Sequence, residues 1–305
     1  MGLFFALSGF LITTLLIEEQ LLRGRVSLRL FYVRRLLRLI PALLTMLSGV
    51  VLLAWVLGRS RVWQDAVFAM FYAGNWAQIY GGRFPFLAHT WSLAVEEHFY
   101  LLWPIAFLLA WRWRGPGAAQ WVAIGGAAAA LLLRLGLLLS GDSSRRLQYG
   151  SDTRADAILV GCAAALLISR RRTRLPRWAS VVSWIILLAL LFVSPVSRPM
   201  LSAGFSVIAV CGSVVVAGAV MAGSAVGGFL RWRPLVGVGR VSYGLYLWHF
   251  PVIKLLLPRF DAHMPHALAL AAVVVVFSTA TLLSYRLIEQ PALVLKRRFA
   301  AKSIA

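Results

Sequence analysis

Apolar residues run along this chain in nine long stretches, separated by short polar segments rich in arginine. A helix that crosses a bilayer needs about 17 to 25 mostly apolar residues, because the hydrocarbon core is about 30 Å thick. The pattern therefore predicts an all-α, polytopic integral membrane helix bundle with about nine transmembrane helices. The predicted spans are 1–17, 39–58, 91–111, 119–139, 155–169, 178–194, 201–222, 241–258 and 266–286.

The basic residues give these predicted helices a direction. If the tenth apolar stretch, 66–80, is interfacial or re-entrant, alternate loops on one side, together with Arg286, hold 21 of the 31 Lys and Arg but only three of the ten acids. Cytoplasmic loops carry the excess of Lys and Arg. The segments predicted to be cytoplasmic are 18–38, 112–118, 170–177, 223–240 and 287–305.

Composition excludes an ordinary soluble domain, since 61% of residues are hydrophobic, 13% are charged and the mean hydropathy is +0.82. The net charge of +21 indicates topology and affinity for anionic lipid rather than nucleic-acid binding. Both cysteines fall inside predicted spans and no HExxH-type spacing occurs, so no metal site is predicted. We expect one membrane domain, 1–291, followed by a basic cytoplasmic tail, 292–305.

The most informative polar stretch is His89 to Tyr100, at the mouth of an apolar run. Ionisable groups at membrane depth are costly and indicate a functional site. On a helix Glu96 and Tyr100 share one face, and His89 precedes the first turn, where it is placed to fold back over it. This arrangement suits general acid–base catalysis. The alternative is an interfacial aromatic belt with incidental charges.

Two further polar groups interrupt apolar runs. Arg154 lies between Asp152 and Asp156, and we expect it to pair with either acid, as a neutralised cluster or as the wall of an acceptor or catalytic cavity. His249 follows Tyr246 by about one turn; a packing role and a catalytic role remain equally open. Ser8-Gly9 is interpreted as a small-residue helix contact, since no GxSxG elbow is present.

Six segments, in this order and at this spacing, resemble the acyltransferase family 3 membrane enzymes, which O-acylate sugars of lipopolysaccharide, peptidoglycan, root-nodulation factors and macrolides. They are Phe4–Thr13, Phe31–Pro41, His89–Pro104, Asp152–Gly161, Gly239–His249 and Tyr285–Pro291. The resemblance implies a ten-span domain with acyl-CoA engaged from the cytoplasm and an acceptor sugar met outside or within the membrane. The nine spans equal that domain without its first helix, where the family usually carries an Arg and a His; the chain is therefore expected to be incomplete at its start or an inactive paralogue.

The expected function is O-acyl transfer, most simply of acetyl, to a hydroxyl of a cell-surface glycan or secreted molecule, in the inner membrane of a bacterium. Acyl-CoA is the expected co-substrate, with no bound cofactor. The family's Arg-x-x-Arg motif falls on Arg35 and Arg38, and guanidinium groups suit the phosphates of CoA; positive-inside anchoring is the alternative. The candidate site residues are Glu96, His89, His249, Asp156 and Arg154 for catalysis and Arg34, Arg35 and Arg38 for the donor. The competing class is a transporter or flippase of lipid-linked sugars, which predicts internal repeats with broken helices.

Overall fold

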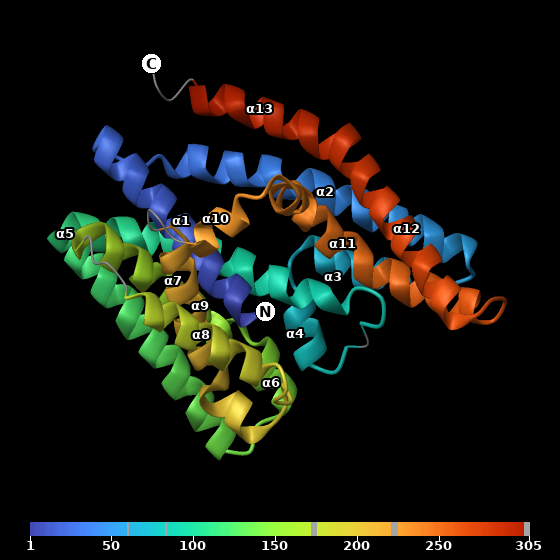
Figure 1. Cartoon of the computed structure of the whole chain (residues 1–305), viewed down its shortest axis with the longest axis horizontal. Coiled ribbons are helices and arrows are strands. Elements are labelled where there is room, and N and C mark those ends of the chain that lie inside the picture. The colour runs from blue at the N-terminus through green and yellow to red at the C-terminus, as the bar shows by residue number, and fades with distance from the viewer. Residues whose placement is uncertain (60, 83, 172–175, 221–224, 302–305) are drawn as a thin grey trace. The chain divides into compact units, whose positions relative to one another are not determined.

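The computed structural model describes residues 1–59, 61–82, 84–171, 176–220 and 225–301, and its regular structure within these ranges is helical throughout (Figure 1). The chain divides into two compact units, which are described separately. One comprises Met1–Val26 and Ser92–Trp232, and the other comprises Ser27–Trp91 and Arg233–Ala305. The all-α prediction is confirmed.

The first unit is built around α1, which packs against α7 and α9. The helix α9 also packs against α7 and α8, so α1, α7 and α9 form the centre of this unit. Its elements are α1 (Gly2–Arg23), α5 (Trp91–Leu139), α6 (Ser144–Tyr149), α7 (Ser151–Arg171), α8 (Arg177–Leu190), the π-helix η2 (Met200–Gly204), α9 (Phe205–Val220) and α10 (Ala225–Leu230).

Two glycines let α1 and α7 approach backbone to backbone. A Cβ atom added to Gly9 would lie 2.0 Å from the carbonyl oxygen of Ile158, and one added to Gly161 would lie 2.0 Å from the carbonyl oxygen of Ala6. Each helix therefore presents a glycine to the main chain of the other. This confirms the interpretation of Gly9 as a small-residue contact, the usual way in which membrane helices pack closely.

The element α5 contains two of the predicted spans joined by a tight turn. Arg114 and Gly115 leave helical geometry, and Gly115 adopts a φ of 72° that glycine accommodates without steric cost. The proline that follows, Pro116, restricts the turn further. A sharp turn at this point reverses an apolar helix without a long loop.

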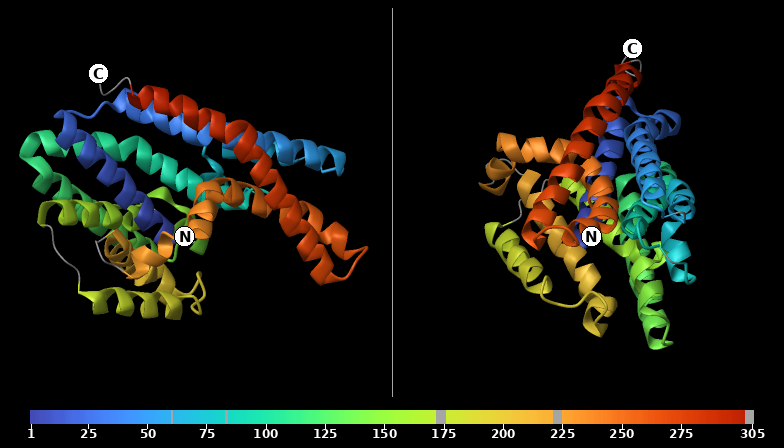
Figure 2. Two further views of the ribbon diagram at one scale, coloured as in Figure 1. Left: turned by 45° about the horizontal axis from the view of Figure 1, so that its top comes forward. Right: turned by 90° about the vertical axis from the view of Figure 1, so that its right-hand side faces the viewer.

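The second unit pairs its helices along their lengths. The helix α13 packs against α2, as Figures 1 and 2 both show, and α11 packs against α12. The elements are α2 (Leu28–Val56), α3 (Val62–Met70), α4 (Gly74–Ile79), the 3₁₀ turn η1 (Ala88–Thr90), α11 (Arg233–Asp261), α12 (His266–Ser284), the π-helix η3 (Tyr285–Glu289) and α13 (Gln290–Ala301).

Five helical stretches of the described chain are long and apolar enough to cross a membrane. They are Gly2–Arg23, Leu28–Val56, Ala88–Leu139, Met200–Val220 and His266–Lys296. Each predicted span overlaps helix in the described part of the chain, but the count of nine stays a prediction, because α7 and α11 are not among these five stretches and α8 has only 14 residues. The stretch 66–80 forms the short helices α3 and α4, of 9 and 6 residues, and neither is long enough to span.

Candidate active site

Glu96 is held in the first unit by two hydroxyl groups. Its carboxylate, only 5% exposed, accepts hydrogen bonds from Ser8 of α1 and, at 2.5 Å, from Tyr100 of α5. Tyr100 follows Glu96 by four residues, so the helix itself brings the phenol onto the carboxylate, as the spacing predicted. Nearby, the indole of Trp103 donates to the hydroxyl of Thr13 at 3.0 Å. Two side-chain hydrogen bonds therefore join α5 to α1.

Ser8 has a role that sequence reasoning missed. Interpreted only as a small residue at a helix contact, it is instead a hydrogen-bond donor to a buried carboxylate. The side chain is 7% exposed. Sequence gave no signal for this pairing, because Ser8 and Glu96 are 88 residues apart.

His89 and His249 are brought together in the second unit. Their ring centroids lie 5.6 Å apart in an edge-to-face arrangement, and His89 also contacts the rings of Tyr246 and Phe250. The hydroxyl of Tyr246 donates to the backbone carbonyl of His89 at 2.6 Å. The Nδ1 atom of His249 faces the carbonyl oxygens of Tyr246 at 2.7 Å and Leu245 at 3.1 Å. Those acceptors place the proton on Nδ1, which leaves Nε2 as the basic nitrogen.

Glu96 and the two histidines belong to different units. The network that would join Glu96 to His89 or His249 therefore stays a prediction. Ser242, one of the polar residues that suggested a catalytic role for His249, is exposed and donates to the carbonyl of Gly239 within its own helix. It adds nothing to the histidine pair.

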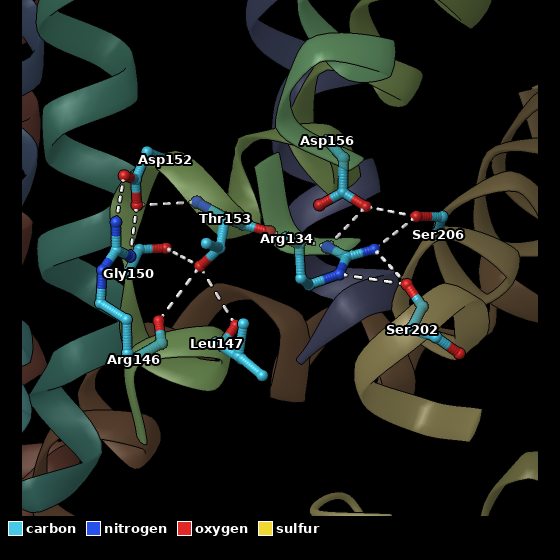
Figure 3. Close-up of polar contacts among 9 residues, drawn as sticks. All are labelled: Arg134, Arg146, Leu147, Gly150, Asp152, Thr153, Asp156, Ser202 and Ser206. Carbon is cyan, nitrogen blue, oxygen red and sulfur yellow. Dashed lines mark hydrogen bonds and ion pairs between the residues drawn. The ribbon is translucent and has the colours of Figure 1, made fainter. Parts of the chain in front are cut away.

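A buried arginine of α5 organises the polar interior of the first unit (Figure 3). Arg134 is fully buried and lies 2.9 Å from Oδ2 of Asp156. It donates to the carbonyls of Thr153, at 2.7 Å, and Ser202, at 3.2 and 3.3 Å, and to the hydroxyl of Ser206 at 2.7 Å. Ser206 in turn donates to Oδ2 of Asp156 at 2.5 Å. Arg134 thus links α5, α7 and the η2–α9 segment.

The hydrogen bonds of the two acids next to Arg154 come from other arginines, although Asp156 lies within electrostatic reach of Arg154. Asp152 accepts two hydrogen bonds from Arg146, at 2.7 and 2.5 Å, and Oδ2 of Asp156 is held by Arg134 (Figure 3). Both acids are therefore bound by arginines from outside the Asp-Thr-Arg-Ala-Asp segment. Arg146 and Arg134 approach these acids from α6 and α5.

Arg154 lies instead between two aromatic rings. Its guanidinium carbon is 3.7 Å from the ring centroid of Phe205 in α9 and 5.5 Å from that of Phe5 in α1. The side chain is 1% exposed, and its Nε and Nη1 atoms have no hydrogen-bond partner among the described residues. Oδ1 of Asp156 is likewise buried without one. The site thus combines unused donors with an unused acceptor.

Arg134 was absent from the residues that the sequence singled out. The signal was present, because an arginine inside the apolar run 119–139 is an ionisable group at membrane depth. Its partners, by contrast, lie 19 to 72 residues further along the chain, and a sequence pattern does not reveal them.

The predicted donor-binding arginines form one cationic group with a lysine that the sequence did not single out. Arg34, Arg35 and Arg38 lie on α2, and α13 carries Lys296 close enough for its charge to interact with all three. Arg34 and Arg35 are half-buried, whereas Arg38 is exposed. The group offers several N–H donors to an anion. No cluster of three or more metal-binding side chains is found among the described residues.

A family model described as "Acyltransferase domain" matches residues 1–285. The chain belongs to this acyltransferase family. The polar groups described above, Lys296 excepted, fall within the matched part of the acyltransferase domain.

Several curated proteins are similar to this acyltransferase domain. The putative peptidoglycan O-acetyltransferase YrhL of Bacillus subtilis is 33% identical over 95% of this chain and 49% of its own length. The peptidoglycan O-acetyltransferase OatA of Listeria monocytogenes is 34% identical over 95% and 50%, and the O-acetyltransferase OatA of Staphylococcus aureus is 33% identical over 94% and 51%. The chain therefore spans about half the length of these relatives. No solved structure matches it.

Proposed function

We propose that this chain is a membrane O-acetyltransferase domain that moves an acetyl group from acetyl-CoA to a hydroxyl of peptidoglycan or a related cell-envelope glycan. The names of the relatives support acetyl as the group and peptidoglycan as the acceptor. The apolar helices support an integral membrane protein, and the bacterial relatives support the bacterial cytoplasmic membrane.

The observation that carries the proposal is the buried carboxylate of Glu96 between two hydroxyl groups. Acyl transfer to a sugar requires a base for the proton of the attacking hydroxyl. Glu96 supplies a carboxylate, and its bonds from Ser8 and Tyr100 fix its orientation. The Tyr100 phenol is also a proton carrier in direct contact with the base. In the proposed reaction Glu96 takes the proton, directly or through one of these hydroxyls.

The histidine pair provides a second basic group. Nδ1 of His249 is committed to backbone carbonyls, and the backbone of His89 is fixed by the Tyr246 hydroxyl. An imidazole whose tautomer is fixed in this way offers a single defined basic nitrogen. In the proposed mechanism this pair assists proton transfer as a second basic group.

The test of the base is Glu96→Gln, with Glu97→Gln as the matched control. The glutamine retains the size of the side chain but cannot take a proton, so acetyl transfer from radiolabelled acetyl-CoA to a soluble peptidoglycan fragment should fall by about 10² to 10⁴-fold. Glu97→Gln removes the same charge one residue away and should retain most activity. Normal activity of Glu96→Gln, at equal amounts of inserted protein, would assign this carboxylate to structure.

The donor site is proposed at Arg35 and Arg38, assisted by Arg34. Lysine keeps the charge but cannot reproduce the two-pronged contact of a guanidinium with a phosphate. Losing one charge-assisted contact costs about 1.5 to 3 kcal/mol, so Arg35→Lys and Arg38→Lys should each weaken the apparent affinity for acetyl-CoA about tenfold or more.

Arg29→Lys is the control for this donor site, because Arg29 is exposed on the same helix. Its affinity for acetyl-CoA should stay at the wild-type value. Apparent affinities are measured at a fixed acceptor concentration. Unchanged affinity in both the Arg35 and Arg38 variants would leave these residues as membrane anchors only.

A further inference from the structure

Arg154 is a fully buried cation that is electrostatically coupled to Asp156, but two nitrogen atoms of the arginine have no hydrogen-bond partner among the described residues. It lies in the first turn of α7, is 1% exposed, and contacts the faces of Phe5 and Phe205. Its Nε and Nη1 atoms have no hydrogen-bond partner in the described part of the chain. Aromatic faces attract a guanidinium, but they accept no strong hydrogen bond in place of the lost water.

The carboxylates nearest in sequence are each bound by another arginine. Oδ2 of Asp156 is occupied by Arg134 at 2.9 Å and by Ser206 at 2.5 Å, and Asp152 is bound by Arg146. Arg134, Arg154 and Asp156 therefore form a buried group with two positive charges and one negative charge. Removing a partner from a buried ion pair leaves an unstable, uncompensated ion. A buried ionisable group of this kind is therefore a candidate for a functional role.

We propose that Arg154 binds the negatively charged acyl oxygen during transfer, and that Arg134 keeps Arg154 available by holding Asp156. This inference rests on the proposed acetyl transfer. The oxygen of the acceptor hydroxyl forms a bond to the acyl carbon while its proton passes to the base. The C=O electron pair moves onto the acyl oxygen, which accepts a hydrogen bond from one of the two unpartnered N–H groups of Arg154, on Nε or on Nη1. When the C=O bond re-forms, the C–S bond breaks and the thiolate leaves with the electron pair, to be protonated as CoA thiol.

The charge of the group favours this singly charged oxygen. A net charge of one matches an oxyanion or a carboxylate, whereas a doubly charged phosphate would also face the carboxylate of Asp156. A fixed cationic donor in a desolvated site stabilises developing charge far better than water does. The predicted topology places this end of α7 toward the outer face, where the acceptor glycan is expected. The Oδ1 atom of Asp156 is a buried acceptor without a hydrogen-bond partner among the described residues.

The first test measures anion binding without turnover. The probe is sodium acetate, a stable carboxylate, added to the detergent-solubilised full chain against sodium chloride at equal ionic strength. Wild type should show an acetate-dependent rise in melting temperature, and Arg154→Gln should lose it. Arg146→Gln is the matched control: it breaks a more exposed arginine–carboxylate pair at the same end of α7 and should keep the rise. An undiminished rise in Arg154→Gln would overturn the proposal.

The second test examines the part played by Arg134. Arg134→Gln frees Asp156 to pair with Arg154, so the acetate effect should disappear although Arg154 is intact. The double variant Arg134→Gln/Asp156→Asn removes the competing carboxylate and should restore it. Such a rescue distinguishes the proposed role from simple damage to the fold. If the double variant folds, as judged by a single size-exclusion peak, and fails to bind acetate, Arg134 does not act through Asp156.

The third test uses kinetics and separates two sources of the anionic oxygen. If the oxygen belongs to the acyl group, Arg154→Gln should lower kcat by about 10² to 10³-fold and leave the KM for the glycan unchanged. A raised glycan KM at unchanged kcat would indicate a carboxylate of the acceptor instead and would overturn the acyl-oxygen assignment. If Arg154→Gln does not fold, Arg154→Lys replaces it and should show the same kcat loss in weaker form.

The failure of this inference can be told apart from that of the proposed function. Absence of acetyl transfer from acetyl-CoA in wild type would refute the proposed function. The acetate-binding tests need no turnover and decide the Arg154 site by themselves.

Discussion

Asp65 offers the sharpest test of how burial affects the charge of a side chain. It lies on α3, outside the candidate spans, and is only 5% exposed. The backbone N–H of Phe86 donates to this carboxylate, but Oδ2 has no partner in the described part of the chain. Burial raises the pKa of Asp65 from the usual 3.8 to about 6, against a smaller opposite effect of the Phe86 hydrogen bond. The folded protein therefore binds this proton more tightly than the unfolded chain does.

The sign of the effect on stability follows from this difference in proton affinity. Below pH 3.8 the group is protonated in both states, and the free energy of unfolding carries no penalty. Between about pH 4 and 6 the unfolded chain releases the proton first, so stability falls as the pH rises. Above pH 6 the penalty is constant. A shift of about two pKa units corresponds to at most about 3 kcal/mol.

Asp65→Asn removes this penalty, because the amide keeps the shape of the side chain and still accepts from Phe86. The variant should be more stable than wild type by up to about 3 kcal/mol at pH 7.5 and equally stable at pH 4. Unfolding in detergent is followed by loss of helical circular dichroism at several pH values. Asp142→Asn, at an exposed carboxylate, is the control. A difference between Asp65→Asn and wild type that does not change from pH 4 to 7.5 would refute the reasoning.

Two further predictions concern packing and topology. Gly9→Ala places a methyl group 2.0 Å from a carbonyl oxygen of α7 and should destabilise the protein by about 1 to 3 kcal/mol in the same unfolding assay. The control, Gly136→Ala, adds a methyl group in open space and should be neutral or stabilising. Equal effects of the two changes would contradict the close helix contact. Single cysteines at Arg25 and Ser144, in a background without the two native cysteines, should differ in labelling by an impermeant thiol reagent, with only the second reacting in intact cells. Equal labelling of the two cysteines would contradict the predicted topology.

Local features of the fold could be predicted from the sequence. The apolar runs located the helices, because length and hydropathy act within one segment. The contact of Glu96 with Tyr100 followed from their spacing of four residues on one helix. The turn at Gly115 fell in the polar interval 112–118 between two apolar runs, where a connection was expected.

Contacts between distant segments could not be predicted in the same way. His89 and His249 were each named as candidates, but their proximity depends on how η1 and α11 pack. Sequence proximity drew attention to Arg154 as the partner of Asp152 and Asp156, and the ion pairs of those acids with Arg146 and Arg134 could not be read from it. Which of several arginines reaches a carboxylate is decided by helix direction and rotation, and neither is encoded in local spacing.

The reciprocal glycines of α1 and α7 have a genetic consequence. At both crossings the atom that an added methyl group would meet is a main-chain carbonyl oxygen, at Ile158 and at Ala6. Every amino acid has that oxygen, so no exchange at either contacted position removes the clash. A suppressor screen starting from Gly9→Ala should therefore recover few intragenic revertants at Ile158. Revertants should instead carry changes elsewhere that allow the two helices to separate, or restore glycine itself.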